Sequence, residues 1–147
     1  MSKNTLNLDT SGLDELINKL KKLEGDVKGA VTDALEQAAQ TVEEDTREAV
    51  QPQYLPAHGK YQGKEKDTEK AIVTGAKATW HGTTAEINVG FDYSKPGAGG
   101  FLITGTPRMK PDKALQKIYK QKKYMAQLQA DMGAVVSDYI REKMEGG

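Results

Sequence analysis

The densest group of chemically active side chains is a run of seven basic residues between positions 108 and 123, with Asp112 as its only acid. Three of them, Lys113, Lys117 and Lys120, are spaced to share one face of a helix. Such a cluster can bind the phosphates of nucleic acids, dock on an acidic protein, or form a solvated face. Few aromatic residues lie among the bases, so the sequence favours the last two. The seven are Arg108, Lys110, Lys113, Lys117, Lys120, Lys122 and Lys123.

Four acidic side chains form a second cluster. They are Glu43, Glu44, Asp45 and Glu48. On a helix these residues project from neighbouring turns around one polar face, which is more typical of a solvated surface than of a metal site.

The two histidines and a Gly-Thr-Pro sequence lack the partners that catalysis would need. His58 falls in a predicted loop and His81 in a predicted turn, with no nucleophile and base arranged beside either. Residues 105–110 lack the GxxxxGK[ST] spacing of a phosphate-binding loop, so we interpret them as a turn before a helix. The sequence therefore predicts no catalytic residue, no cofactor and no metal, and we expect a protein that is not an enzyme.

The composition excludes several classes of protein. The chain has 147 residues, which favours a single domain over residues 1–147. With no cysteine and two histidines, it forms neither a disulfide scaffold nor a three-histidine zinc site. No apolar run approaches the ~20 residues of a membrane helix, and the polar first residues do not resemble a signal peptide. We expect a soluble protein with no membrane contact.

Charge is distributed unevenly although the chain is neutral overall. Residues 1–50 carry six basic and eleven acidic side chains, a net charge of −5, whereas residues 108–147 carry nine and five, a net charge of +4. Leu, Ile, Val and Phe together number 27, which indicates a thin core. An acidic front and a basic back suit an interface.

The first half of the chain has the pattern of a strand followed by a long amphipathic helix. Residues 4–8 alternate as a strand does, and apolar residues then recur at steps of three and four over residues 13–50. Ser11 or Thr10 is expected to cap this helix, and Gly25 or Gly29 to bend or break it. Pro52 ends it.

Residues 71–80 and 83–91 alternate as two strands of a β-hairpin that turns at His81-Gly82. Its buried face is predicted to hold Ala85, Ile87, Val89 and Phe91. A short strand follows at 101–103. Two Gly-rich or Pro-rich stretches, 51–69 and 94–100, are interpreted as mobile loops.

A second amphipathic pattern runs from Pro111 to Met144, with a break expected near Lys122–Tyr124. The predicted class is therefore α+β. A small antiparallel sheet, made of the hairpin and short strands, packs against a long N-terminal and a long C-terminal amphipathic helix.

Several short motifs, in this order, resemble those of the head–tail joining, or neck, proteins of long-tailed bacteriophages, which include tail-completion and minor structural proteins. The resemblance begins at Gly12-Leu13-Asp14-Glu15-Leu16 before an alanine-rich helix. It continues through Val89-Gly90 at the end of a hairpin, Gly105-Thr106, and a last helix that starts at Pro111-Asp112-Lys113-Ala114-Leu115. Two departures are Leu102-Ile103-Thr104, where members often have a Glu, and Arg108–Pro111, which replaces a Pro-Phe-rich segment. The similarity covers residues 6–144.

The resemblance implies a structural virion protein that self-associates into a ring and joins the DNA-filled head to the tail. Its partners would be other copies of itself and neighbouring head-completion and tail proteins, with incidental contact to DNA in the neck channel. It would be found in the virion, and in the host cytoplasm during assembly.

Four aromatic residues in or beside the predicted loops are candidate interface anchors, together with the basic residues Arg108, Lys110, Lys113, Lys117 and Lys120. They are Tyr54, Tyr61, Tyr93 and Phe101. For Tyr93 and Phe101, completion of the sheet's core is an equally good interpretation. The alternative function is a small nucleic-acid-binding module that uses the basic helix 108–123.

Overall fold

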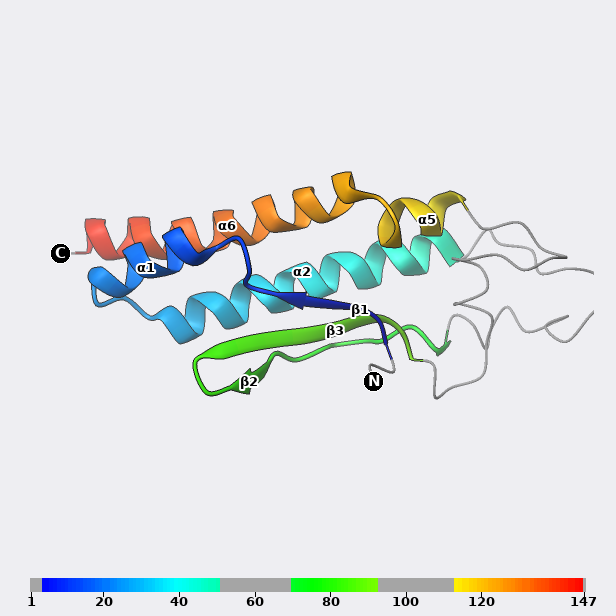
Figure 1. The fold of residues 1–147 in the computed structure, drawn as a ribbon, viewed down its shortest axis with the longest axis horizontal. Helices are drawn as coiled ribbons and strands as arrows, with labels where there is room; N and C mark the ends of the chain where they lie inside the picture. The colour runs from blue at the N-terminus through cyan, green and yellow to red at the C-terminus, as the bar shows by residue number, and fades with distance from the viewer. Residues whose placement is uncertain (1–3, 51–69, 93–112, 147) are drawn as a thin grey trace, which may run out of the picture.

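The computed structural model describes residues 4–50, 70–92 and 113–146, and it confirms the α+β class. Three strands and four helices lie in these ranges (Figure 1). The strands are β1 (Asn4–Asp9), β2 (Thr79–His81) and β3 (Thr84–Asp92). The helices are α1 (Asp14–Lys22), α2 (Val27–Val50), α5 (Lys113–Tyr119) and α6 (Lys122–Glu145). The predicted loops 51–69 and 94–100 and the strand 101–103 lie outside the described residues, as does His58.

The strands form one antiparallel sheet in the order β1-β3-β2, with β2 and β3 joined as the predicted hairpin. The four apolar residues expected on the inner face of β3 are all buried. β1 also follows the prediction, and its Leu8 is 2% exposed. The sheet therefore has one face in the core, as the alternation in the sequence required.

The strand predicted over residues 71–80 is wrong in its middle. Only its two ends pair with β3, through β2 and through an isolated bridge between Ile72 and Phe91. Between them, the backbone N–H groups of Gly75 and Ala78 donate to the Glu43 and Glu36 carboxylates of α2. These carboxylates replace the carbonyls of a neighbouring strand as acceptors, so the segment leaves the sheet.

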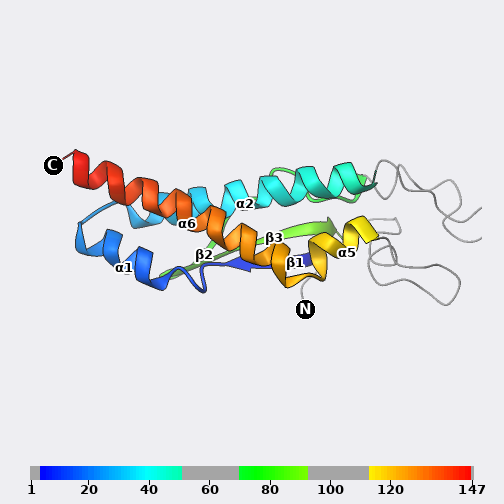
Figure 2. The same cartoon turned by 90° about the horizontal axis from the view of Figure 1, so that it is seen from above.

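The long helices α2 and α6 run antiparallel along the length of the molecule, and α1 lies against α6 (Figures 1 and 2). α2 packs on the buried face of β3 and also contacts α5 and α6. The core therefore lies around α2, where Ala30, Ala34 and Leu35 are fully buried. Alanines at these positions allow the close approach of sheet and helix.

The first amphipathic pattern is divided into two helices by a turn at Leu23–Asp26. The Glu24 N–H donates to the Lys21 carbonyl and the Gly25 N–H to the Leu20 carbonyl, both at 3.0 Å. These two bonds form a Schellman motif, in which Glu24 adopts the left-handed conformation with φ +58°. The break falls at Gly25, one of the two predicted glycines, whereas Gly29 lies inside α2.

The predicted cap of the first helix is wrong. No side chain caps α1, whose N-cap residue is Leu13. The Ser11 hydroxyl and N–H both bond to the Asp9 carboxylate instead, because a short polar side chain readily closes a local turn. A side-chain cap occurs at α2, where the Gly29 N–H donates to Asp26 Oδ1 at 2.8 Å.

Glu24→Gly is expected to raise the free energy of unfolding by about 0.5–1 kcal/mol, because glycine adopts a positive φ without the steric cost that a β-carbon brings. Urea unfolding of the variant and the parent measures the gain. Glu24→Ala is the matched control, since it removes the same charge but keeps the β-carbon. An equal gain in both variants would show that charge, rather than backbone strain, is responsible.

The second amphipathic pattern is also divided, at Lys120 and Gln121, between α5 and α6. A break was expected near Lys122–Tyr124, so its existence is confirmed and its position is slightly earlier. None of the described helices is long and apolar enough to cross a membrane.

Candidate assembly interface

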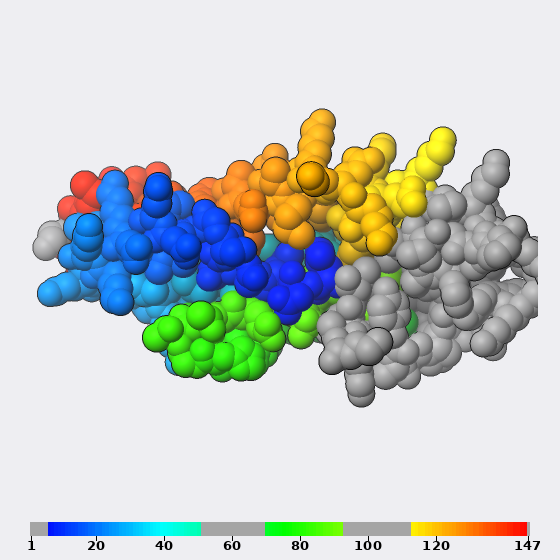
Figure 3. Space-filling model, viewed as in Figure 1, coloured from blue at the N-terminus to red at the C-terminus, as the bar shows by residue number. Residues whose placement is uncertain are grey.

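Five lysines gather where α5 meets α6, and we call them the lysine cluster. All five are exposed: Lys113, Lys117, Lys120, Lys122 and Lys123. In the space-filling view, side chains of α5 and of the start of α6 project from the surface (Figure 3). The cluster does not follow one continuous helix, because α5 ends at Tyr119. The other candidates, Arg108, Lys110, Tyr54, Tyr61, Tyr93 and Phe101, lie outside the described residues.

Lys113 and Lys117 form a lysine pair on the outer face of α5. Leu115 lies two residues from each of them and is fully buried. At 3.6 residues per turn, side chains two residues apart are separated by about 160° around the helix axis. Both lysines therefore lie opposite Leu115. Tyr119, four residues after Leu115, is on the inner face, where its hydroxyl meets the Thr46 hydroxyl of α2.

The four side chains of the acidic cluster of α2 do not share one solvated face. The prediction of a solvated face is wrong for Glu43 and Asp45. Glu43 accepts from the Gly75 N–H at 2.8 Å, and Asp45 accepts from the Tyr124 hydroxyl at 2.7 Å. Glu44 and Glu48 remain exposed. We call these two residues the acidic pair.

The acidic pair lies on the face of α2 that points away from α5. Thr46 is two residues from both Glu44 and Glu48, is fully buried and contacts Tyr119 of α5. The same rotation of about 160° places both carboxylates opposite this contact. α2 and α5 lie at opposite edges of the molecule in the second view (Figure 2). The acidic pair and the lysine pair therefore face outward on opposite sides of one packed pair of helices.

Three tyrosine hydroxyls join the C-terminal helices to polar groups of α2. Tyr119 meets Thr46, Tyr124 donates to Asp45, and Tyr139 donates to Asp33. Burial, followed by the bond to Asp45, raises the pKa of Tyr124. These bonds were not predicted from the sequence. The three tyrosines lie in the second amphipathic pattern, and its periodicity does not show where a hydroxyl will find an acceptor.

The bond between Tyr139 and Asp33 predicts a pH dependence. It is the main cause that raises the pKa of Tyr139 from 10.0 to about 12, so the folded chain holds this proton more tightly than the unfolded chain. Its contribution to stability is complete below pH 10 and is lost as the pH rises toward 12. Urea unfolding at pH 9, 10 and 11 should show a smaller fall for Tyr139→Phe than for the parent. Parallel curves would contradict the assignment.

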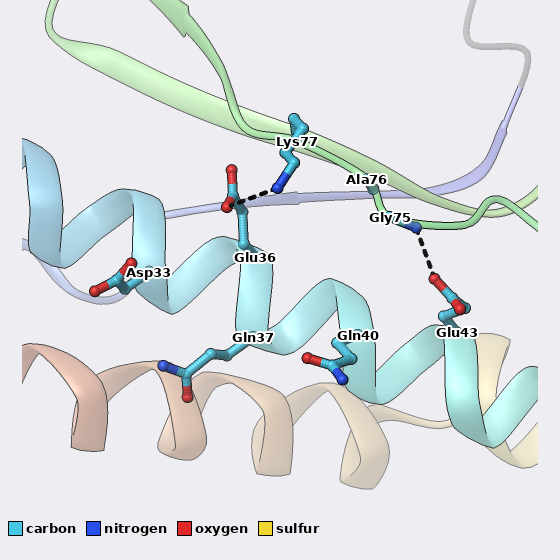
Figure 4. A pocket seen from close by; sticks show the side chains of 8 residues that line it. All are labelled: Asp33, Glu36, Gln37, Gln40, Glu43, Gly75, Ala76 and Lys77. Carbon is cyan, nitrogen blue, oxygen red and sulfur yellow. Dashed lines mark hydrogen bonds and ion pairs between the residues drawn. The ribbon is translucent and has the colours of Figure 1, made fainter.

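A pocket of about 400 Å³ lies between α2 and the segment that leaves the sheet (Figure 4). Its carboxylates come from Asp33, Glu36 and Glu43, and each of them already accepts a hydrogen bond from Tyr139, Ala78 or Gly75, respectively. Within the described residues, no group of three or more His, Cys, Asp or Glu side chains is placed to hold a metal ion. Glu36 and Glu43 therefore fix the segment to α2, whereas Asp33 joins α2 to α6.

Trp80 and His81 of the hairpin contact neighbouring side chains. The Trp80 indole N–H donates to the Thr32 hydroxyl at 3.2 Å, and the Lys28 ammonium lies 5.6 Å from the Trp80 ring centroid. His81 is exposed at the end of β2, with Nε2 3.4 Å from Glu86 Oε1. The Trp80 contacts hold the hairpin on α2, whereas His81 and Glu86 meet within the hairpin.

No family model, curated protein or solved structure matches the chain. Among the described residues, the features that suit binding are two outward-facing sets of opposite charge, held on rigid helices.

Proposed function

We propose that the protein is a structural component of the neck of a long-tailed bacteriophage, where copies of the chain associate into a ring that joins the head to the tail. The observation that carries the proposal is the order of short motifs along an α+β chain. Val89-Gly90 lies within β3, close to its end, and Lys113-Ala114-Leu115 begins α5.

The charge distribution supports the same proposal. A ring is built from a repeated contact between two different patches of the chain. The acidic pair of α2 and the lysine cluster at α5–α6 are two such patches on rigid helices. The small core also fits a subunit that gains stability when copies and neighbouring proteins bury more of its surface.

Electron microscopy of particles made without this protein tests the proposal. We expect DNA-filled heads and separate tails, with joined particles restored when the protein is supplied in trans. Mass spectrometry should also find the chain in purified virions. Normal joined particles in its absence would refute the proposal.

Nucleic-acid binding is the second candidate, favoured by the five exposed lysines, which have no ion-pair partner in the part of the chain that the structure describes. If the lysine cluster binds duplex DNA, the affinity should fall steeply with salt. Each lost phosphate contact should then lower the slope of log affinity against log salt by about 0.9. A gel shift at low salt with no retarded band would exclude it.

A further inference from the structure

The lysine pair and the acidic pair have matching geometry. Lys113 and Lys117 are four residues apart on α5, and Glu44 and Glu48 are four residues apart on α2. On a helix this spacing places neighbouring side chains about 5–6 Å apart, so the two pairs can align when the helices lie alongside. They point outward on opposite faces, so one chain cannot join its own two pairs.

Both pairs are exposed, and neither is neutralised by another described residue. None of the four side chains has an ion-pair partner within residues 4–50, 70–92 and 113–146. The Gln40 side-chain amide donates a hydrogen bond to the Glu44 carboxylate at 3.2 Å. Because this amide is neutral, the negative charge of Glu44 stays uncompensated. The nearest cation along α2, Arg47, pairs with Glu43 at 3.1 Å.

The charges also decide the symmetry of a contact between two copies. An arrangement that places either pair against its own copy brings like charges together, which is unfavourable. A favourable arrangement places α5 of one copy against α2 of the next. Such a head-to-tail contact leaves the opposite patch of each copy free for another neighbour, so the association continues until it closes into a ring or forms a filament.

We propose that Lys113 and Lys117 of one copy dock on Glu44 and Glu48 of the next copy, as the repeated contact of a head-to-tail assembly. The proposal rests on the proposed function, in which copies of this chain associate into a ring, and it names the surfaces that meet. The other three residues of the lysine cluster border the same contact. Their positive charge strengthens the long-range attraction between the two copies before they meet.

Charge reversal tests the contact in the full-length protein. We call Lys113→Glu/Lys117→Glu the acidic variant, since both of its pairs are then negative, and Glu44→Lys/Glu48→Lys the basic variant, since both of its pairs are then positive. Sedimentation velocity at low salt should show concentration-dependent association of the parent that weakens at high salt. Each variant alone should associate more weakly by about tenfold or more.

Mixing the two variants gives the decisive measurement. The acidic α5 of one variant matches the basic α2 of the other, and the reverse contact is the parental one. An equimolar mixture should therefore regain association that neither variant shows alone, and so should the single chain that carries all four substitutions. Circular dichroism and urea unfolding check that each variant is folded.

Lys21→Glu/Lys22→Glu is the matched control, because it reverses two exposed lysines at the end of α1 and should leave association unchanged. Failure of the mixture to associate would overturn the proposed contact, as would parental association in either variant or a parent that stays monomeric at low salt. DNA binding lost in the acidic variant, without rescue of association, would assign the lysines to nucleic acid instead. None of these results changes the joining test with whole particles, so the two proposals fail separately.

Discussion

Phe91→Ala is expected to lower the free energy of unfolding by about 3–5 kcal/mol, the range found when a buried phenylalanine is truncated to alanine. Phe91 is 1% exposed at the end of β3, and its ring centroid lies 6.3 Å from that of Tyr119 on α5. The side chain therefore joins the sheet to the C-terminal helices. Urea unfolding at neutral pH, followed by circular dichroism, measures the loss.

Met144→Ala is the control for Phe91→Ala, because its side chain is 62% exposed on the last turn of α6. Its truncation should change the free energy of unfolding by no more than about 0.5 kcal/mol. Similar losses in both variants would contradict a core concentrated around β3 and α2.

The size of the Phe91 effect matters because the core is small. Domains of this kind have a total stability of about 5–15 kcal/mol, so this one truncation removes a large share. Many of the buried positions in α2 are alanines, which bury little area each. Stability therefore depends on the larger fully buried side chains, of which Phe91, Leu35 and Leu128 are examples.

The periodic parts of the fold were predictable from the sequence. Alternation over residues 83–91 identified both β3 and its buried face, and the steps of three and four residues identified the four helical segments as two interrupted patterns. These signals are strong because each buried face must be apolar at the period of its own element.

The departures from the predictions come from hydrogen bonds to polar side chains, some remote in sequence and some nearby, that the periodic pattern does not identify. The segment before β2 leaves the sheet because Glu43 and Glu36, more than thirty residues earlier, accept its N–H groups. Ser11 bonds to Asp9 although it stands where a cap is expected. Local pattern does not show which acceptor a donor will find, so such bonds were not predictable.

One half of the candidate interface was predictable from the sequence and the other half was not. The lysine cluster was visible in the sequence, because five bases without an acid among them is a strong compositional signal. The acidic pair could not be told apart from the other two acidic residues of its cluster until the structure showed that Glu43 and Asp45 bond within the molecule. The opposition of the two pairs depends on how α5 packs on α2, which periodicity does not specify.

Gly90→Ala is expected to lower the free energy of unfolding by about 1–3 kcal/mol, because the substitution forces a β-carbon into a conformation that L-residues rarely adopt. Gly90 is buried, with φ +101°, and its carbonyl accepts from the Val73 N–H at 2.7 Å. It lies in a β-bulge, since β1 advances two residues from Asn4 to Leu6 while β3 advances three from Val89 to Asp92. Urea unfolding of the variant measures the loss.

Gly133→Ala provides the contrast for Gly90→Ala. Gly133 lies within α6, where an added β-carbon would meet Leu16 Cδ1 at 3.4 Å, an ordinary contact distance. The gain in helix propensity, up to about 1 kcal/mol, should offset any crowding, so no loss is expected. If Gly90→Ala were equally well tolerated, the Val89-Gly90 motif would have no conformational basis. If only Gly90→Ala is destabilised, the motif is needed for the bulge that sets the register between β1 and β3, immediately before Phe91 enters the core.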